Sequence, residues 1–539
     1  MEDKIEMKSK AAWNLKNIIT YAFLGLVVIE ICCLIYYNFA TNYAVDQDSA
    51  KLMYHTIKMW ENKSLIIPDW TYMTTGEWDC SSMLAMPIYG ITGNIILSFA
   101  IANTLNIFIF SVIVWVLMKS VNISNRYIFL ALAIILMPYS WGMLNYANML
   151  FYSGAQYIYK VLLPIALLAL FHYTPKKQNI FLYMMLYVFT EILVFMTISS
   201  SSIFVIACGI IPIFACRILY MFVKKELPSK KEAALLISTT IVMIGAYLMH
   251  IAYGVASNAD GMSLRTLEGL SGAFTENNLN LLSIMQVLPS TGVKVLSGTG
   301  AVSLLKCIIF SFIIIFAVPI MNKFLCLNQL IRSKTAKVES ISDTTLLQSE
   351  LISIFICNYL VTLLTSSTPR YLLVGFISMI LAAVIQYSFY DAAEIVNILL
   401  IGALLVLNLF IQREGCIAVR TIFTENYKKE ICEKILDAAK EQEAELIVIY
   451  DSSEWAEVIR AYDSDYPTVT YYSINDNIWD FDCINKTEAS DLHDLNSILV
   501  VLEGRENELL DQVSDKYQYV YWEDIDGASI YKKSFKTRR

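Results

Sequence analysis

Long apolar runs separated by short polar segments recur along most of the chain. A run of about 20 apolar residues is the length that crosses the hydrocarbon core of a bilayer as a helix. The first run is too long for a signal-peptide core, and no small-residue cleavage site follows it, so we expect it to be retained. The pattern predicts eleven transmembrane helices, at about 18–39, 88–117, 127–144, 155–173, 179–198, 202–223, 233–253, 301–321, 346–365, 371–388 and 395–412.

From residue 417 onward the pattern is that of a soluble α/β domain. Four short apolar segments read as strands, and helical patterns lie between them. A small, partly parallel sheet is the packing that this alternation favours. No glycine-rich phosphate loop is present, so we expect no nucleotide there. We therefore predict a membrane domain at 1–416, followed by a soluble domain at 417–539 with strands at 446–450, 468–473, 498–502 and 519–522.

Composition and charge agree with this division. Of the 539 residues, 57% are hydrophobic and 16% charged, and the mean hydropathy is +0.54, which is typical of membrane proteins. Residues 417–539 contain 26 acidic and 14 basic side chains, a net charge of −12. The rest of the chain has a net charge of +4. The two parts therefore face different environments.

The positions of Lys and Arg predict the orientation in the membrane. If the N-terminus is cytoplasmic, every second loop is basic, and the loops between them are poor in Lys and Arg. This places the 41–87 loop, the 254–300 loop, residues 366–370 and the C-terminal domain on the outer side. Cys432 and Cys483 of that domain either pair there or stay reduced, and we find no Cys/His set with metal-ligand spacing.

The 41–87 loop is long for a connector, and it contains six carboxylates, four of which are candidate site residues. From Ser49 its pattern is that of an amphipathic helix, with Lys51 and His55 on the polar side, and we expect this helix to lie flat on the outer membrane surface. Asp48 would be the N-cap of the helix, and Asp46 comes two residues earlier. Asp48 is then a plain cap or a catalytic group, and Asp46 is a solvated carboxylate or a general base.

Three further residues are candidates on the same side of the membrane. Glu77 and Asp79 lie where the loop returns to the bilayer, in TTGEWDCSS. Arg370, in TSSTPRYLL, begins the span at 371–388. An arginine there is either an interfacial anchor or a bidentate, permanently charged ligand for a phosphate.

Together these residues resemble the GT-C class of integral-membrane glycosyltransferases, which includes protein O-mannosyltransferases and bacterial aminoarabinose transferases. The resemblance covers the whole chain as architecture, but only two short stretches as motif. These are the acids after the first span and the Arg370-Tyr371-Leu372 element. Many relatives have two adjacent acids, whereas Gln47 separates them here.

The resemblance implies a polytopic helical fold in the bacterial cell membrane and an inverting transfer from a polyprenyl-phosphate sugar to an envelope glycan, lipid or protein. It implies that Asp46, with Asp48 beside it, is the catalytic base and that Arg370 contacts the donor phosphate. Lys51 and His55 would assist Arg370, and Glu77 and Asp79 would contact the acceptor. A divalent cation between Asp46 and Asp48 is left open.

Two alternatives remain. A transporter or flippase of lipid-linked saccharides would carry charges at mid-bilayer depth, for which Glu30, Glu191, His172 and His250 are the candidates. A polysaccharide polymerase or ligase uses the same kind of lipid donor and has its main outer loop late in the chain, where the 254–300 loop lies. The sequence names neither the sugar nor the acceptor.

Overall fold

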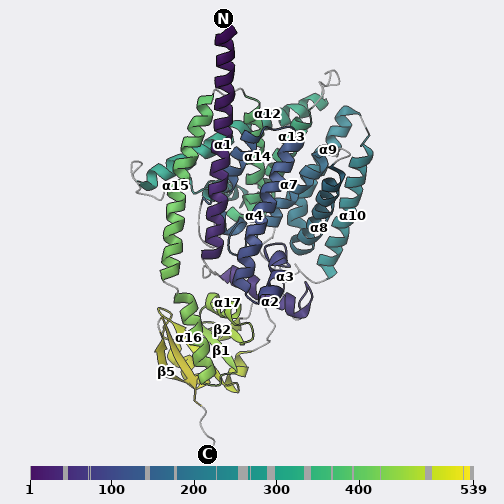
Figure 1. Cartoon of the computed structure of the whole chain (residues 1–539). Helices are drawn as coiled ribbons and strands as arrows, with labels where there is room; N and C mark the ends of the chain where they lie inside the picture. The colour runs from purple at the N-terminus through teal and green to yellow at the C-terminus, as the bar shows by residue number, and fades with distance from the viewer. Residues whose placement is uncertain are drawn as a thin grey trace, which may run out of the picture. The chain divides into compact units, whose positions relative to one another are not determined.

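A computed structural model gives the conformation of most of the chain (Figure 1). It describes all residues except 1, 41–46, 69, 71, 73–74, 140–145, 175–178, 226, 253–264, 267–268, 288–297, 333–341, 366–367, 391–393, 425–426, 480–487, 526 and 535–539. In the helical segments 2–14, 298–299, 323–332, 416–424 and 427, it describes the backbone only.

The chain forms two compact units. Unit 1 contains Met1–Tyr36, Met73–Cys80 and Asn103–Cys416, and unit 2 contains Tyr37–Tyr72, Ser81–Ala102 and Ile417–Arg539. One of the divisions between the units falls after residue 416, and the predicted domain bounds stay a prediction. The structure differs from the prediction in that most of the 41–87 loop groups with the C-terminal domain, a long-range association that local sequence patterns do not report.

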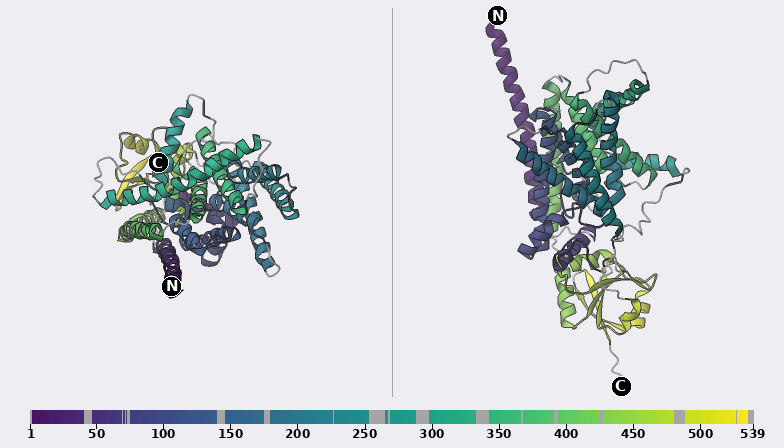
Figure 2. Two further views of the ribbon diagram at one scale, coloured as in Figure 1. Left: turned by 90° about the horizontal axis from the view of Figure 1, so that it is seen from above. Right: turned by 90° about the vertical axis from the view of Figure 1, so that its right-hand side faces the viewer.

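Unit 1 is a helical bundle, seen from two further directions in Figure 2. Helix α14 lies at its centre, because it packs against α5, α7, α12 and α13 and all its residues from Leu373 to Tyr387 are buried. The helices are α1 (Glu2–Ala40), α4 (Ile95–Ser120), α5 (Asn125–Ile135), α6 (Tyr146–Leu150), α7 (Ile158–His172), α8 (Ile180–Val205), η2 (Ile206–Ile210), α9 (Ile211–Lys224), α10 (Lys230–Ala252), α11 (Leu270–Ile284), α12 (Gly298–Arg332), α13 (Asp343–Leu364), η5 (Pro369–Leu372), α14 (Leu373–Ser388) and α15 (Glu394–Thr424).

Eight helical segments among the described residues are long and apolar enough to span a membrane. One of them, Ile180–Lys224, has 45 residues, about twice the length that a bilayer requires. It is broken at Ser202 (φ 48°, ψ −125°) and contains a π-helical turn, η2, so it covers two predicted spans. The spans predicted at 127–144 and 155–173 correspond to the shorter helices α5 and α7. A helical membrane protein is thus confirmed, and the number eleven stays a prediction.

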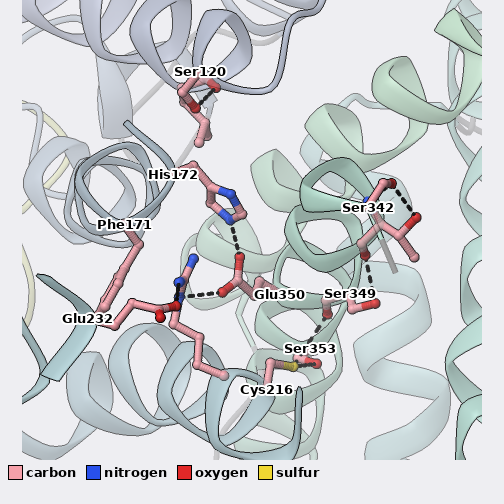
Figure 3. Close-up of polar contacts among 12 residues, drawn as sticks. Ser120, Phe171, His172, Cys216, Glu232, Ser342, Ser349, Glu350 and Ser353 are labelled. Atoms are coloured by element: carbon pink, nitrogen blue, oxygen red, sulfur yellow. Dashed lines mark hydrogen bonds and ion pairs between the residues drawn. The ribbon is translucent and has the colours of Figure 1, made fainter. Parts of the chain in front are cut away.

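A buried ionic network joins four of these helices (Figure 3). Glu350 on α13 is fully buried, and its carboxylate lies 2.6 Å from His172 Nε2 and 2.8 Å from Arg217 Nε. Arg217 also pairs with Glu232 on α10 at 3.0 Å. A buried charge is tolerated when it is paired in this way, so the network fixes α7, α9, α10 and α13 against one another.

Unit 2 contains a six-stranded sheet in the order β3-β2-β1-β4-β6-β5. Strands β2, β1 and β4 are parallel, and β3, β5 and β6 pair antiparallel at the edges. The four predicted strands are confirmed as β1, β2, β4 and β5. The elements are α2 (Gln47–Asn62), α3 (Ser82–Thr92), α16 (Tyr427–Glu441), β1 (Leu446–Tyr450), α17 (Ser453–Tyr462), β2 (Thr468–Tyr472), β3 (Asn477–Trp479), η6 (Ala489–His493), β4 (Ser497–Leu502), α18 (Leu510–Tyr517), β5 (Tyr519–Ile525) and β6 (Ala528–Lys533).

The central strands are buried on both faces because helices cover the sheet on each side. Every residue of β1 and β4 is buried. Helix α17 packs against β1 and β2, and α18 packs against β5. Cys432 on α16 is buried, whereas Cys483 lies outside the described residues, so their pairing stays open.

Candidate functional site

Of the two predicted catalytic acids, the structure describes Asp48 alone. Asp46 is outside the described residues. Asp48 is half-buried and lies in the first turn of α2, within the helix that begins at Gln47 and not at the N-cap position that the sequence predicted. A carboxylate in a first turn is stabilised by the positive end of the helix dipole. The helix therefore holds one of the two acids in a defined place in unit 2.

His55, which was predicted to assist in phosphate binding, is fully buried in unit 2. Its ring lies 4.6 Å from that of Trp70 and 5.6 Å from that of Tyr72, whose hydroxyl is 3.3 Å from His55 Nε2. Burial, together with the charge of Lys51, lowers the pKa of His55 to about 3. A neutral, enclosed imidazole offers no cation to a phosphate, so we leave His55 out of the phosphate-binding set. Lys51 itself is half-buried.

Residues 75–80 of the 41–87 loop belong to unit 1, where they pack on the broken helix α8. Trp78 is fully buried, and its Nε1 donates to Ser199 Oγ at 3.1 Å. The Gly76 amide donates to the Ser200 carbonyl at 3.0 Å. A Cβ at Gly76 would lie 2.4 Å from the Trp78 ring, so only glycine fits this turn. The loop is thus fixed at its return to the membrane.

Asp79 is the centre of this attachment. It is only 1% exposed, and Ser200 Oγ and Ser201 Oγ each donate to one of its carboxylate oxygens at 2.6 Å. Lys160 on α7 is buried as well, and its Nζ lies 3.0 Å from Asp79 Oδ2 and donates to the Gln156 carbonyl at 3.0 Å. A buried carboxylate with these partners has little surface for an acceptor. The acceptor contact of Asp79 stays a prediction, and its described contacts favour a structural role in holding the loop.

The break in α8 provides the partners of Asp79. Four consecutive serines, 199–202, end its regular part, and serine hydroxyls compete with helical backbone hydrogen bonds. The Ser199 carbonyl accepts from His250 Nδ1 at 2.9 Å. Irregular backbone at membrane depth is tolerated where protein encloses it, and here the loop residues do so.

Arg370 is half-buried in η5 and reaches the same region of unit 1. Its guanidinium lies 5.2 Å from the centre of the Tyr371 ring. Tyr371 packs against Phe204 at 5.8 Å and against Tyr157 at 6.2 Å, and the ammonium of Lys160 lies 4.9 Å from the Tyr157 ring. An aromatic cluster thus connects Arg370 to the pair of Lys160 and Asp79. The structure brings together two stretches that the sequence identified separately.

Lys160 was missed by the sequence reasoning. Its signal is a single lysine inside an apolar span, in QYIYKVLLP. Burying an ionisable side chain in such a segment costs free energy unless it has a partner, so this lysine marks a functional or structural site. Lys306, Arg217 and Glu350 are further buried ionisable residues of the spans, and each has a described partner.

Glu77 is half-buried and has a positive φ of 64°. Its backbone carbonyl accepts from Cys80 Sγ at 3.3 Å. Among the described residues, no group of three or more His, Cys, Asp or Glu side chains could hold a metal ion. Asp46 is outside that set, so the divalent cation between Asp46 and Asp48 stays untested.

No protein-family model matches the sequence, and no curated protein does. Among solved structures, the crystal structure of ArnT from Cupriavidus metallidurans bound to undecaprenyl phosphate aligns with a TM-score of 0.56. The alignment covers 95% of this chain and 98% of that chain at 7% identity. The apo structure of the same protein aligns with a TM-score of 0.45 at 9% identity. The comparison shows the fold: this chain has the GT-C-like membrane fold, with its C-terminal α/β domain, over nearly its entire length.

Proposed function

We propose that this protein is a membrane glycosyltransferase that moves a sugar from a polyprenyl-phosphate donor to a hydroxyl group of an envelope acceptor. The observation that carries the proposal is the shared fold over 95% of the chain with a protein crystallised with undecaprenyl phosphate. Asp46 and Asp48 of the 41–87 loop and a cation in η5 supply the residue types that such a transfer requires.

In the proposed reaction, Asp46 accepts the proton of the acceptor hydroxyl as its oxygen attacks the anomeric carbon of the donor sugar. The bond between that carbon and the donor phosphate oxygen breaks, the new glycosidic bond forms with inversion, and the polyprenyl phosphate leaves. Arg370 and Lys51 stabilise the negative charge that develops on the phosphate. Asp48 holds the first turn of α2 and supports Asp46.

The buried groups of unit 1 have a different part in this proposal. Lys160 is paired with Asp79, so its charge is already balanced, and we assign both residues to fixing the loop. The half-buried Glu77 is left as the loop carboxylate for acceptor contact. The basic loops support a location in the bacterial cell membrane, with the N-terminus cytoplasmic and the C-terminal domain outside.

The proposal is tested with purified protein in liposomes that contain a panel of undecaprenyl-phosphate-linked radiolabelled sugars and an extract of envelope acceptors. We expect label to leave the lipid for an acceptor, and the Asp46→Asn variant to transfer none. Label that crosses the bilayer but stays on the lipid would instead show a flippase. Joining of lipid-linked saccharides to one another would show a polymerase.

A further inference from the structure

Helix α2 of unit 2 is enclosed on all sides, although its sequence predicts a helix with one exposed face. Six consecutive residues, Leu52 to Ile57, are buried, and so is Met59. A helix at a lipid surface buries only one stripe of side chains. The cover comes from α3 and from α17, both of which pack against α2. Two segments whose contacting residues are 406 positions apart in the sequence therefore share one core.

Helix α17 is buried in the same way, from Ala456 to Ala461, because the sheet covers one side and α2 another. Its Arg460 is 5% exposed, donates through Nε to the Thr468 carbonyl at 2.8 Å, and lies 3.4 Å from Glu457 Oε1. The same guanidinium lies 5.7 Å from the centre of the Tyr54 ring on α2. One planar cation thus contacts the sheet, its own helix and α2.

A hydrogen bond joins the two helices at their starts. Gln47 Nε2 donates to Ser453 Oγ at 2.9 Å. Gln47 is the first residue of α2 and neighbours Asp48, and Ser453 is the first residue of α17, just after the carboxyl end of β1. In doubly wound sheets that edge is where ligands bind. Here a side chain from the first outer loop of the same chain reaches it.

We infer that the C-terminal domain positions the 41–87 loop. Ser453 and Arg460 are the positioning residues: they contact α2 and thereby hold its first turn in place. The consequence of this inference rests on the proposed function: residues far from the proposed chemistry set the position of Asp48. The domain serves the transfer by folding together with the loop that bears the acids.

The test is hydrogen exchange of the full-length protein in detergent, for the wild type, Ser453→Ala and the control Ser490→Ala. Ser490 is exposed and lies in η6 of the same domain. Ser453→Ala should speed exchange of the amides at 52–57 about five-fold, the factor that one hydrogen bond of typical strength contributes to a local opening. Ser490→Ala should leave them unchanged. Unchanged exchange in Ser453→Ala and in a second variant, Arg460→Lys, would overturn the inference.

Transfer kinetics provide the second measurement, with whichever undecaprenyl-phosphate-linked sugar of the panel is used by the wild type. Ser453→Ala should lower turnover at saturating donor by a similar factor and leave the donor KM unchanged, because Ser453 has no part in donor binding. Equal losses of turnover in Ser453→Ala and Ser490→Ala would contradict a positioning role. If the wild type transfers no sugar, the proposed function fails, while the exchange data still decide whether the domain holds α2.

Discussion

The pair of Asp79 and Lys160 allows a quantitative test of how the 41–87 loop is fixed. In the wild type, both charges are buried and balanced. Asp79→Asn leaves the Lys160 ammonium buried without its carboxylate, and Lys160→Met leaves the Asp79 carboxylate with only two serine hydroxyls. Removing one member of a buried ion pair typically costs about 3–5 kcal/mol. We therefore expect each substitution to favour opening of residues 75–80 by roughly 10²–10⁴-fold.

Cys80 reports this opening directly, because its thiol is buried beside Asp79. Purified protein is treated with a maleimide, and the modification of Cys80 is followed over time by peptide mass spectrometry. When reclosing is faster than the reaction, the labelling rate is proportional to the open population. Cys432 is an internal control in unit 2, since it is buried too and burial raises the pKa of its thiol to about 12.

The double variant sharpens the test. With both Asp79→Asn and Lys160→Met, no unbalanced charge remains, so its labelling rate should be much lower than the product of the two single effects predicts. If Cys80 is labelled at the wild-type rate in both single variants, the ion pair does not hold the loop. If Cys432 accelerates equally, the substitutions unfold the whole protein and the assignment to the loop is refuted.

Four further predictions concern the other candidate residues. Asp46→Asn should reduce transfer by about 10²–10⁴-fold at matched membrane levels. Asp48→Asn should be milder, because asparagine is nearly isosteric with aspartate and the first turn of α2 loses only the interaction of one charge with the helix dipole; the reverse order would move the base to Asp48. Arg370→Lys should lower turnover at limiting donor, since lysine keeps the charge but loses the bidentate fork; unchanged turnover would leave Arg370 as an anchor. His55 is neutral in the folded protein, whereas in the unfolded chain it becomes protonated below its ordinary pKa of 6.5. The free energy of unfolding should therefore be about 2 kcal/mol lower at pH 5 than at pH 7. The His55→Phe variant should lack this difference when its thermal unfolding is measured at the two pH values. Glu350→Gln should lower the free energy of unfolding by about 3–5 kcal/mol in a denaturation assay, because it removes the charge that both His172 and Arg217 face; a wild-type midpoint would show that the network is not needed for stability.

The sequence predicted the membrane architecture well because the bilayer imposes one dominant pattern. Spans such as those of α1, α10 and α13 need about twenty apolar residues, and no distant partner changes that requirement. The strands of the C-terminal domain could also be predicted, since short apolar segments flanked by polar turns are a local signal. The sequence pattern did not predict the break at Gly93. Its positive φ of 64° ends α3 there, so the span predicted at 88–117 is divided between two helices.

The site was harder to predict because its groups depend on distant partners. The helical pattern of α2 placed His55 on a polar face, but a cover supplied in part by α17 encloses that helix. Lys160 carries a signal of its own, whereas its partner Asp79 lies 81 positions earlier, and nothing in either local segment connects the two. Sequence reasoning identified Asp79 as important and gave it a different role, because burial decides between an anchor and a contact.

The composition of unit 2 from three separate segments has a consequence for how the protein is made. Residues 37–72 leave the ribosome roughly 470 residues before the end of the chain that completes their core. At about 5–20 residues per second, the loop with the proposed catalytic acids waits roughly half a minute to a minute and a half for its partner. During that interval, α2 is an amphipathic segment open to proteases and chaperones. Until residues 417–539 are made, the membrane spans can insert while unit 2 still lacks the segment that covers α2.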